Sequence, residues 1–465
     1  MGSTDDRVDV LVRSHRIFLP ESEFDGSVGI VGERIAGIYA AGEEPTAQTV
    51  IDVGDQCVIP GLVDTHCHLR DPGFTHKENF ESGTRAAALG GVTTVIDMPN
   101  VNPPTDRVEI FEKHIDNART KAVVDFGHNA AGTNLDEIAG LAKAGATAFK
   151  IFMMGDIGRD YPHMPGTMVE DVGQLYELFQ AISETGLVCM VHPHNQDVWR
   201  HFVADAFATG DRGPESYGRT FFRDEGLVFN LGIATAIELQ RVTNVKLHIL
   251  HTVSKRALKL IGRAKADQQD VTCELNPHSL FLGGSLENIR RLGPYALGIW
   301  VPDEHVRALW DALNAGELDI IGTDHSPHTR AEKEEGWKDM FKAPGGSPIV
   351  QDYLSLFLTA VNDGHVSLRR IVDTASTAPA KRLGLYPTKG AILVGADADL
   401  VVIDMLRVET LSAKRSEYLC GYVPLEGRRV QGTPIMTILR GQVIAKDGEI
   451  LVEAGYGEFV GDRVA

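Results

Sequence analysis

The chain has 465 residues with 45 Lys or Arg against 64 Asp or Glu, so its formal net charge is -19 at pH 7. This charge opposes attraction to phosphate backbones and anionic membranes, which argues against nucleic acid and membrane as partners. A hydrophobic content of 43% argues against a disordered chain, and five widely spaced cysteines argue against a disulfide framework or a thiolate zinc site.

The N-terminus, "MGSTDDRVDVLV", does not resemble a secretory signal, because no basic region precedes an apolar one. No uninterrupted apolar stretch reaches about 18 residues, the length that a membrane-spanning helix needs. With the cysteines expected to be reduced thiols, the sequence predicts a soluble protein of the cytoplasm.

The sequence predicts short strands separated by Gly and Asp turns at both ends of the chain. The pattern appears within residues 1–56, in "VDVLVRSHRIFLP" and "GSVGIVGERIAGIYA". It returns within residues 389–465, in "KGAILVGADADLVVID" and "TPIMTILRGQVIAKDGEIL". We therefore predict a small β-sandwich-like domain assembled from both termini.

Between these ends, residues 57–388 alternate apolar runs with amphipathic helical segments, such as 106–120 and 303–316. The eight runs cover residues 57–69, 91–100, 122–132, 146–153, 187–195, 245–254, 270–279 and 318–329. Eight strand–helix units predict an α/β fold, a (β/α)8 TIM barrel. Most runs begin apolar and finish with His, Asp, Asn or Lys, which places polar groups at the C-terminal mouth where barrel enzymes carry their chemistry. Histidines elsewhere, such as His114, His201 and His365, are expected at the surface or in packing.

The first run contains "DTHCHLRDPG", in which His66 and His68 alternate along a strand and so point to the same side, about 7 Å apart. Neutral imidazole nitrogens suit zinc and its neighbours among the divalent metals. An H-x-H pair is common by chance, but its place at a barrel mouth favours a metal site.

Lys150 lies within the apolar run "ATAFKIFM", where a buried ammonium is costly. The side chain either reaches the barrel rim, pairs with Asp324, or has a lowered pKa and reacts with carbon dioxide. The resulting carbamate is an anionic ligand whose two oxygens can bridge two cations. His192, His251 and Asp324 close three further runs, and each taken singly has an alternative interpretation as a capping or turn residue.

The longer motifs resemble one family over nearly the whole chain. They are "IPGLVDTHCHLRDPG", "FESGTRAAALGGVTTVIDMPN", "FKIFM", "VHPHN", "HILHTVS", "TDHSPHT" and "TASTAPAKRLGLYPTKGAILVGADADLVVID". The resemblance is to the cyclic amidohydrolases, which include dihydroorotases, allantoinases, hydantoinases and dihydropyrimidinases. It implies a small cyclic amide as substrate and a homo-oligomer, either a tetramer or a dimer.

The resemblance also implies a binuclear metal site with two divalent ions, which we expect to be zinc, with manganese, cobalt or iron as alternatives. The implied ligands are His66, His68 and Asp324 on one ion, His192 and His251 on the other, and a carbamate on Lys150 and a hydroxide bridging both. Two neighbouring histidines, His248 and His194, are alternative candidates for the ligands in these two runs. The family pattern favours His251 over His248 and His192 over His194, and His194 stands where relatives often carry Glu.

The implied reaction is hydrolysis of a ring amide. The cations generate the attacking hydroxide and polarise the carbonyl, while Asp324 takes the proton and passes it to the departing nitrogen. Arg70, Asn100 and His328 match the residues that bind the substrate carboxylate in dihydroorotases, and a guanidinium fork suits a planar carboxylate. The alternative is that Arg70 pairs with Asp71 or Asp97 and only supports its loop.

Other features favour different branches of the family. Gly155 stands where D-hydantoinases and dihydropyrimidinases carry a tyrosine that supports the oxyanion, which argues against those two activities. In contrast, "EEGWKDMFKAPGGSP" and the C-terminal β-segment look more like allantoinases and hydantoinases than like most dihydroorotases. We therefore expect a dihydroorotase-like hydrolase, with an allantoinase or hydantoinase acting on a five-membered ureide as the alternative. A non-catalytic scaffold is a remote third interpretation, since all six expected ligands are present.

Residues 155–168 favour a mobile loop over the mouth, in which Tyr161 or His163 supplies an oxyanion donor. The alternative is a plain surface loop.

Overall fold

The structure is a computed structural model that describes residues 7–154, 166–296 and 300–463. Eight strands form one parallel sheet in which each strand pairs with the next along the chain. They are β6 (Leu62–Cys67), β7 (Val92–Asp97), β8 (Asp125–Ala131), β9 (Ala148–Phe152), β10 (Val188–His192), β11 (Lys246–Ile249), β12 (Val271–Leu275) and β13 (Ile320–Ile321). A parallel bridge between Cys67 and His325 joins the first strand to the segment after the last. The predicted barrel is thereby confirmed, with one barrel strand in each of the eight runs, while the first run, 57–69, also contains β5 (Cys57–Pro60) of a second sheet.

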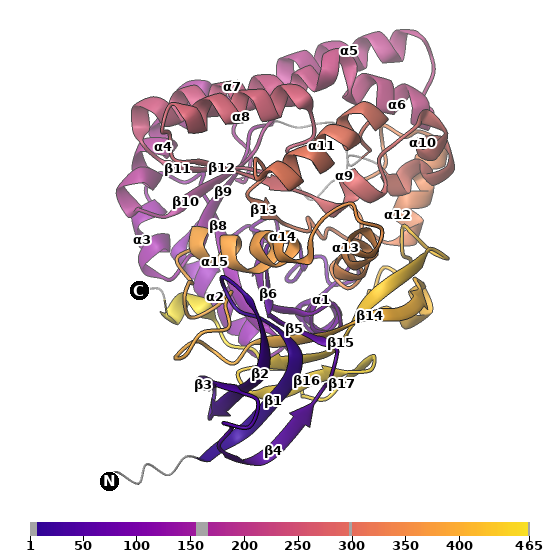
Figure 1. Cartoon of the computed structure of the whole chain (residues 1–465). Coiled ribbons are helices and arrows are strands. Elements are labelled where there is room, and N and C mark those ends of the chain that lie inside the picture. Colours follow the sequence, from indigo (N-terminus) through magenta and orange to yellow (C-terminus); the bar gives the residue numbers. More distant parts are fainter. Residues whose placement is uncertain (1–6, 155–165, 297–299, 464–465) are drawn as a thin grey trace.

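Helices follow the strands and surround the sheet (Figure 1). They are α1 (Phe80–Leu89), α2 (Val108–Arg119), α3 (Ile138–Lys143), α4 (Val172–Thr185), α5 (Gln196–Ala208), α6 (Pro214–Phe221), α7 (Arg223–Thr243), α8 (Lys255–Ala266), α9 (Pro277–Phe281), α10 (Leu286–Leu292), α11 (Asp303–Ala315), α12 (Arg330–Glu334), α13 (Tyr353–Asn362), α14 (Leu368–Val372) and α15 (Ala378–Arg382). The amphipathic segments 106–120 and 303–316 form α2 and α11, as their periodicity predicts.

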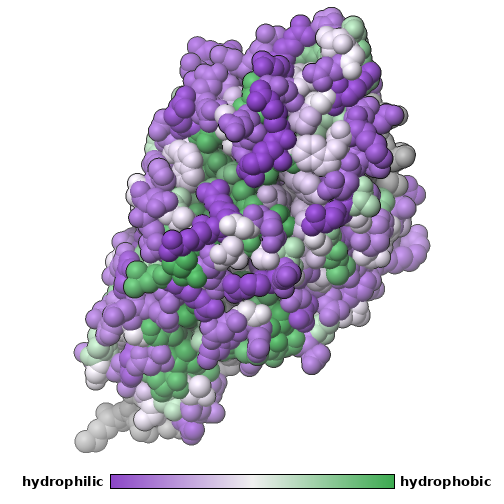
Figure 2. All heavy atoms as spheres, turned by 90° about the vertical axis from the view of Figure 1, so that its right-hand side faces the viewer, coloured by the Kyte–Doolittle hydropathy of each residue, from purple (hydrophilic) through white to green (hydrophobic). Residues whose placement is uncertain are grey.

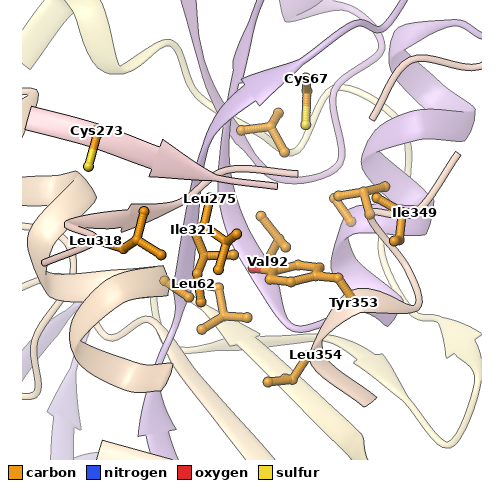
Figure 3. Close-up of a cluster of buried hydrophobic side chains, with 14 of the residues drawn as sticks. Leu62, Cys67, Val92, Cys273, Leu275, Leu318, Ile321, Ile349, Tyr353 and Leu354 are labelled. Carbon is orange, nitrogen blue, oxygen red and sulfur yellow. The ribbon is translucent and has the colours of Figure 1, made fainter. Parts of the chain in front are cut away.

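The strands of the barrel and its outer helices share one apolar core. Figure 3 shows Leu62 and Val92 from neighbouring strands beside Tyr353 and Leu354 of α13. These four side chains are at most 1% exposed, and full burial of such a side chain is worth about 1.5–3 kcal/mol. This packing holds the first residues of β6 and β7 against α13.

Both chain ends join in a second, nine-stranded sheet. Its strands are β1 (Arg7–Phe18), β2 (Glu23–Val31), β3 (Arg34–Ala40), β4 (Thr46–Asp52), β5 (Cys57–Pro60), β14 (Leu400–Thr410), β15 (Arg429–Leu439), β16 (Gln442–Lys446) and β17 (Glu449–Ile450). The two halves meet at β5, which pairs with β1 on one side and with β14 on the other. In Figure 1 the indigo N-terminal strands accordingly lie beside the yellow C-terminal ones. The predicted small β-domain built from both termini is confirmed.

A buried ion cluster connects this sheet region to the barrel. Lys389 Nζ lies 2.9 Å from Asp397, 2.7 Å from Asp399 and 2.5 Å from Asp125, the first residue of β8. Removing Lys389 would leave buried carboxylates without this cation, at a cost of about 3–5 kcal/mol. The cluster therefore fixes how the two parts of the chain meet.

The surface is mostly hydrophilic on the face shown in Figure 2. Hydrophobic residues form scattered patches on this face. Within the described ranges, no helix is both long and apolar enough to cross a membrane. All five cysteines are buried and free, as expected for reduced thiols.

Candidate metal centre

Three predicted ligands meet around the carboxylate of Asp324, just beyond β13. The Nε2 atoms of His66 and His68 each lie 3.3 Å from Asp324 Oδ1, and His251 Nδ1 lies 3.7 Å from Oδ2. One potential ligand atom from each of His66, His251 and Asp324 lies within 4.8 Å of the others. The spacing suits donors that share a metal ion.

The imidazole rings continue across the mouth to His192 at the end of β10. Ring centroids are 5.1 Å apart for His66 and His251, and 4.6 Å apart for His251 and His192. His192 also lies 5.7 Å from the ring of Phe152 at the end of β9. The fold thus brings together histidines that are far apart in the sequence.

Sharp turns at the strand ends direct these side chains. Arg70, His251 and Asp324 have positive φ angles of 61°, 55° and 49°, a conformation that residues other than glycine rarely adopt. Such strain persists only where the surrounding structure enforces it, and it is concentrated at functional sites. Three strained residues in one site mark the mouth as the functional end of the barrel.

Burial sets the charge of the histidines. It lowers the pKa of His68 to about 3 and that of His251 to about 4, so both are neutral near pH 7 and carry the lone pair that a metal needs. Burial by itself would raise the pKa of Asp324, but the surrounding imidazoles of His66, His251 and His68 hold it well below its usual range. The centre therefore presents neutral nitrogens and an anionic carboxylate.

Lys150 lies on β9 with its side chain fully buried. Its Nζ lies 4.4 Å from the ring centroid of Phe152 and has no hydrogen-bond partner among the described residues. Burial lowers the pKa of this amine to about 7, although Asp324 and Glu274 act in the opposite direction. The side chain of Lys150 therefore does not reach the barrel rim, which was one of the alternatives. Its amine can be neutral, and hence nucleophilic, near neutral pH.

Oxygen acceptors fix the orientation of each imidazole. His66 Nδ1 donates to Glu274 Oε1 at 2.9 Å, His251 Nδ1 to Asn276 Oδ1 at 2.9 Å, and His68 Nδ1 to Asn100 Oδ1 at 2.6 Å. With the proton on Nδ1, His66 and His68 turn the lone pairs of their Nε2 atoms toward Asp324. This arrangement is typical of metal-bound histidine.

Glu274 and Asn276 were not predicted as site residues, because the run 270–279 showed only a strand pattern. They are two residues apart at the end of β12 and share one face, and Asn276 Nδ2 also donates to Glu274 Oε1 at 2.6 Å. Gly322 permits this approach, because a Cβ at that position would lie 2.2 Å from the Glu274 carboxylate. The sequence pattern that could have identified Glu274 and Asn276 is a pair of polar residues at alternate positions of a strand end.

The predicted substrate-binding residues divide into two groups. Arg70 is buried, its Nε donates to the Pro327 carbonyl at 3.2 Å, and its guanidinium lies 3.3 Å from His328 Nε2. Lys77, also missed in the sequence, lies 3.3 Å from the other ring nitrogen of His328. Asn100 instead contacts His68 through its carbonyl oxygen.

The carboxylates suggested as alternative partners of Arg70 bind elsewhere. Asp71 pairs with Lys121 at 2.7 Å, and Asp97 accepts a hydrogen bond from the Leu69 amide at 2.8 Å. Arg70 is therefore directed toward His328 and the mouth.

The competing histidines take other places. His248 donates to or accepts from Thr272 at 2.8 Å and lies 3.9 Å from Glu274, outside the group around Asp324. His194 packs edge-on against Trp199 and Phe229. Gly155, Tyr161 and His163 lie outside the described residues.

The orphaned atoms at this centre fit a metal. His66 Nε2 and Lys150 Nζ are buried without a hydrogen-bond partner among the described residues, and buried polar atoms in native proteins are nearly always satisfied. A cation between this imidazole and the Asp324 carboxylate would satisfy His66 Nε2. Imidazole and carboxylate donors suit zinc, manganese, cobalt and iron alike.

Comparison with known proteins agrees with this geometry. Residues 57–444 match the family model described as "Amidohydrolase family". The chain is 34% identical over 466 residues to an L-hydantoinase of Paenarthrobacter aurescens, covering 98% of both chains. It is also 34% identical over 411 residues to a dihydroorotase of Methanosphaera stadtmanae, covering 88% of this chain and 90% of the other. The solved L-hydantoinase (dihydropyrimidinase) of Arthrobacter aurescens superposes with a TM-score of 0.92 at 33% identity, over 97% of this chain and 99% of the other.

Proposed function

The chain belongs to the amidohydrolase family, and from this premise we propose that it hydrolyses the amide bond of a small cyclic amide or ureide. The observation that carries the proposal is the convergence of His66, His68 and His251 on the Asp324 carboxylate. Relatives named for hydantoin and dihydroorotate ring opening support the same class of reaction.

We propose that the centre holds two divalent metal ions, with zinc as the expected metal. His66, His68 and Asp324 would hold one ion, and His192 and His251 the other. Lys150 would bridge them as a carbamate, formed when its neutral amine adds to carbon dioxide and releases one proton. When bound, the ions supply an activated water and polarise the ring carbonyl.

The protein residues then have separate tasks. Asp324 accepts the proton of the attacking water and delivers it to the leaving ring nitrogen, because an amide anion is a poor leaving group. Glu274, Asn276 and Asn100 hold the imidazoles in one tautomer. The product is a ring-opened carbamoyl or ureido acid.

We propose that the substrate ring carries a carboxylate, as in dihydroorotate. Arg70 and His328 lie in contact, and Lys77 adds a second buried cation beside His328, with Glu332 2.6 Å away as its counter-ion. Burial, together with these cations, keeps the pKa of His328 well below its usual range, so it acts as a neutral donor or acceptor. A substrate carboxylate would complement the charge and the hydrogen-bonding groups of Arg70, His328 and Lys77. Asn100 would offer its amide group to the same ligand while its oxygen holds His68.

A hydantoinase or allantoinase activity on a five-membered ureide is the second candidate. It is favoured by the similarity to the L-hydantoinase, which is 34% identical over 98% of this chain and whose solved structure superposes with a TM-score of 0.92. We further propose that the protein works as a homo-oligomer in the cytoplasm.

The test is a substrate panel measured with metal-loaded protein: dihydroorotate, allantoin, 5-substituted hydantoins, dihydrouracil and succinimide. We expect the highest kcat/KM for the carboxylate-bearing ring. Activity confined to uncharged rings would establish the second candidate and contradict the carboxylate group. Full metal content without turnover of any ring would indicate a scaffold instead. Electron density at Lys150 in crystals of the metal-loaded protein tests the carbamate.

A further inference from the structure

A second group of metal-ligating side chains lies outside the barrel mouth. It consists of Asp97 at the end of β7, His114 in the middle of α2 and His128 on β8. All three are at most 1% exposed. None belongs to the centre described above.

The three side chains are spaced as ligands of one ion. Asp97 Oδ2 lies 3.3 Å from His114 Nε2 and 3.1 Å from His128 Nδ1, and one atom from each residue lies within 4.8 Å of the others. A tetrahedral zinc ion with bonds of about 2.0–2.1 Å separates its ligand atoms by roughly 3.3 Å. Two edges of the triangle already have this length.

The polar atoms that face one another remain unsatisfied. Asp97 Oδ2, both ring nitrogens of His114 and His128 Nδ1 have no hydrogen bond to any described residue, in spite of these short distances. Leaving buried polar atoms unsatisfied is costly, and a cation between these atoms would remove that cost.

The outward atoms of Asp97 and His128 have hydrogen-bond partners, as those of metal ligands do. Asp97 Oδ1 accepts from the Leu69 amide at 2.8 Å, and His128 Nε2 lies 2.7 Å from Thr105 Oγ1. These contacts fix the carboxylate and one imidazole while leaving their inner atoms directed at each other. The ring centroids of His114 and His128 are only 3.9 Å apart.

We propose that Asp97, His114 and His128 form a structural site for a divalent cation of the zinc class. The donor set of two imidazoles and one carboxylate suits such an ion. The ion joins α2 to β7 and β8 and, through the Leu69 amide, supports the turn that carries His68 and Arg70. It takes no part in the hydrolysis.

The direct test is a crystal structure of the whole protein grown with zinc, with anomalous scattering recorded at the zinc edge. We expect a peak bonded to Asp97, His114 and His128 at about 2.0–2.2 Å. Absence of a peak there, with the imidazoles hydrogen-bonded to the carboxylate, would overturn the proposal. Peaks at the barrel mouth are scored separately, so failure of either site is recognised by itself.

Metal analysis of variants gives a second test. His128→Gln should lower the bound zinc by about one ion per chain, whereas the control His365→Gln, at an exposed position, should leave the zinc content unchanged. Equal zinc in both variants contradicts the proposal. If His128→Gln does not fold, the double variant His66→Ala with His251→Ala, disabled at the mouth, should still bind about one zinc per chain and gain thermal stability from it. No uptake by that variant would equally overturn the site.

Discussion

The Nδ1 atom of His66 on β6 lies 2.9 Å from the Oε1 atom of Glu274 on β12, across the inside of the barrel. Burial alone would raise the pKa of Glu274, but His66 and His248 hold it well below its usual range, so the residue is an anion. This buried carboxylate fixes the imidazole and increases its basicity toward a metal.

Glu274→Gln should therefore weaken metal binding more than it damages the chemistry. We expect an affinity loss of about 10–100-fold, since neutral amides orient a histidine without increasing its basicity. A competing chelator measures the affinity, and kcat should recover in excess metal. Glu417→Gln, which removes a carboxylate paired with Arg85 at 2.8 Å elsewhere, is the control. Unchanged affinity with a persistently low kcat would contradict this role.

Arg70→Met should discriminate between substrates by their charge. Losing a charge-assisted contact costs about 1.5–3 kcal/mol, so KM for a carboxylate-bearing ring should rise roughly 10–100-fold. KM for an uncharged ring should change little. Lys77→Met is the matched comparison, with a smaller effect expected because Glu332 already pairs with that amine at 2.6 Å. An equal rise in KM for charged and uncharged rings would show that Arg70 only supports its loop.

Reactivation of metal-free protein should depend on pH through Lys150. Only the neutral amine adds to carbon dioxide, and burial lowers the pKa of Lys150 to about 7. The neutral fraction therefore grows as pH rises through about 7 and levels off above it. We expect the recovery rate, measured with fixed metal and dissolved carbon dioxide, to follow that curve. Recovery of full activity in buffers free of carbon dioxide would exclude the carbamate.

Asp324→Asn should remove proton transfer while preserving the shape of the site. A general acid–base group contributes about 10²–10⁴-fold to the rate, and we expect kcat to fall within that range or further because a metal ligand is also weakened. Measurements at saturating metal separate the two effects. A variant with full kcat would eliminate Asp324 as the proton carrier.

Asp352→Asn should stabilise the protein at alkaline pH. Asp352 is buried at the start of α13, where Tyr418 donates to it at 3.0 Å, and burial raises its pKa to about 7. The folded protein thus holds this proton more tightly than the unfolded chain does. The stability present below about pH 4 is lost as pH rises to about 7, by ~2–4 kcal/mol.

The amide of the Asp352→Asn variant does not titrate, so the variant does not lose this stability. The difference in the free energy of unfolding between variant and wild type should therefore increase from pH 5 to pH 8. Denaturation curves at both pH values measure it. Asp136→Asn, at an exposed position, controls for the loss of one negative charge. If the difference between variant and wild type is the same at both pH values, the carboxyl of Asp352 does not titrate in this range.

The sequence by itself determined the barrel and the kind of chemistry. Alternating apolar runs and amphipathic segments are local patterns, and each of the eight runs contains a barrel strand. Alternation along a strand at the barrel mouth made His66 and His68 candidate metal ligands, and the cost of a buried ammonium made Lys150 one. Resemblance of the motifs to the cyclic amidohydrolases supplied the remaining ligands.

Only the tertiary structure decided which side chains meet across the barrel. Glu274 contacts His66 over a separation of 208 residues, and Lys77 contacts His328 over 251, distances at which no local pattern carries information. The same holds for Asn100, which turned out to hold His68, and for His114, which packs against His128 in the interior. Strand pairing and sharp strand-end turns place these residues, because burial and hydrogen bonding between distant segments are properties of the closed barrel as a whole.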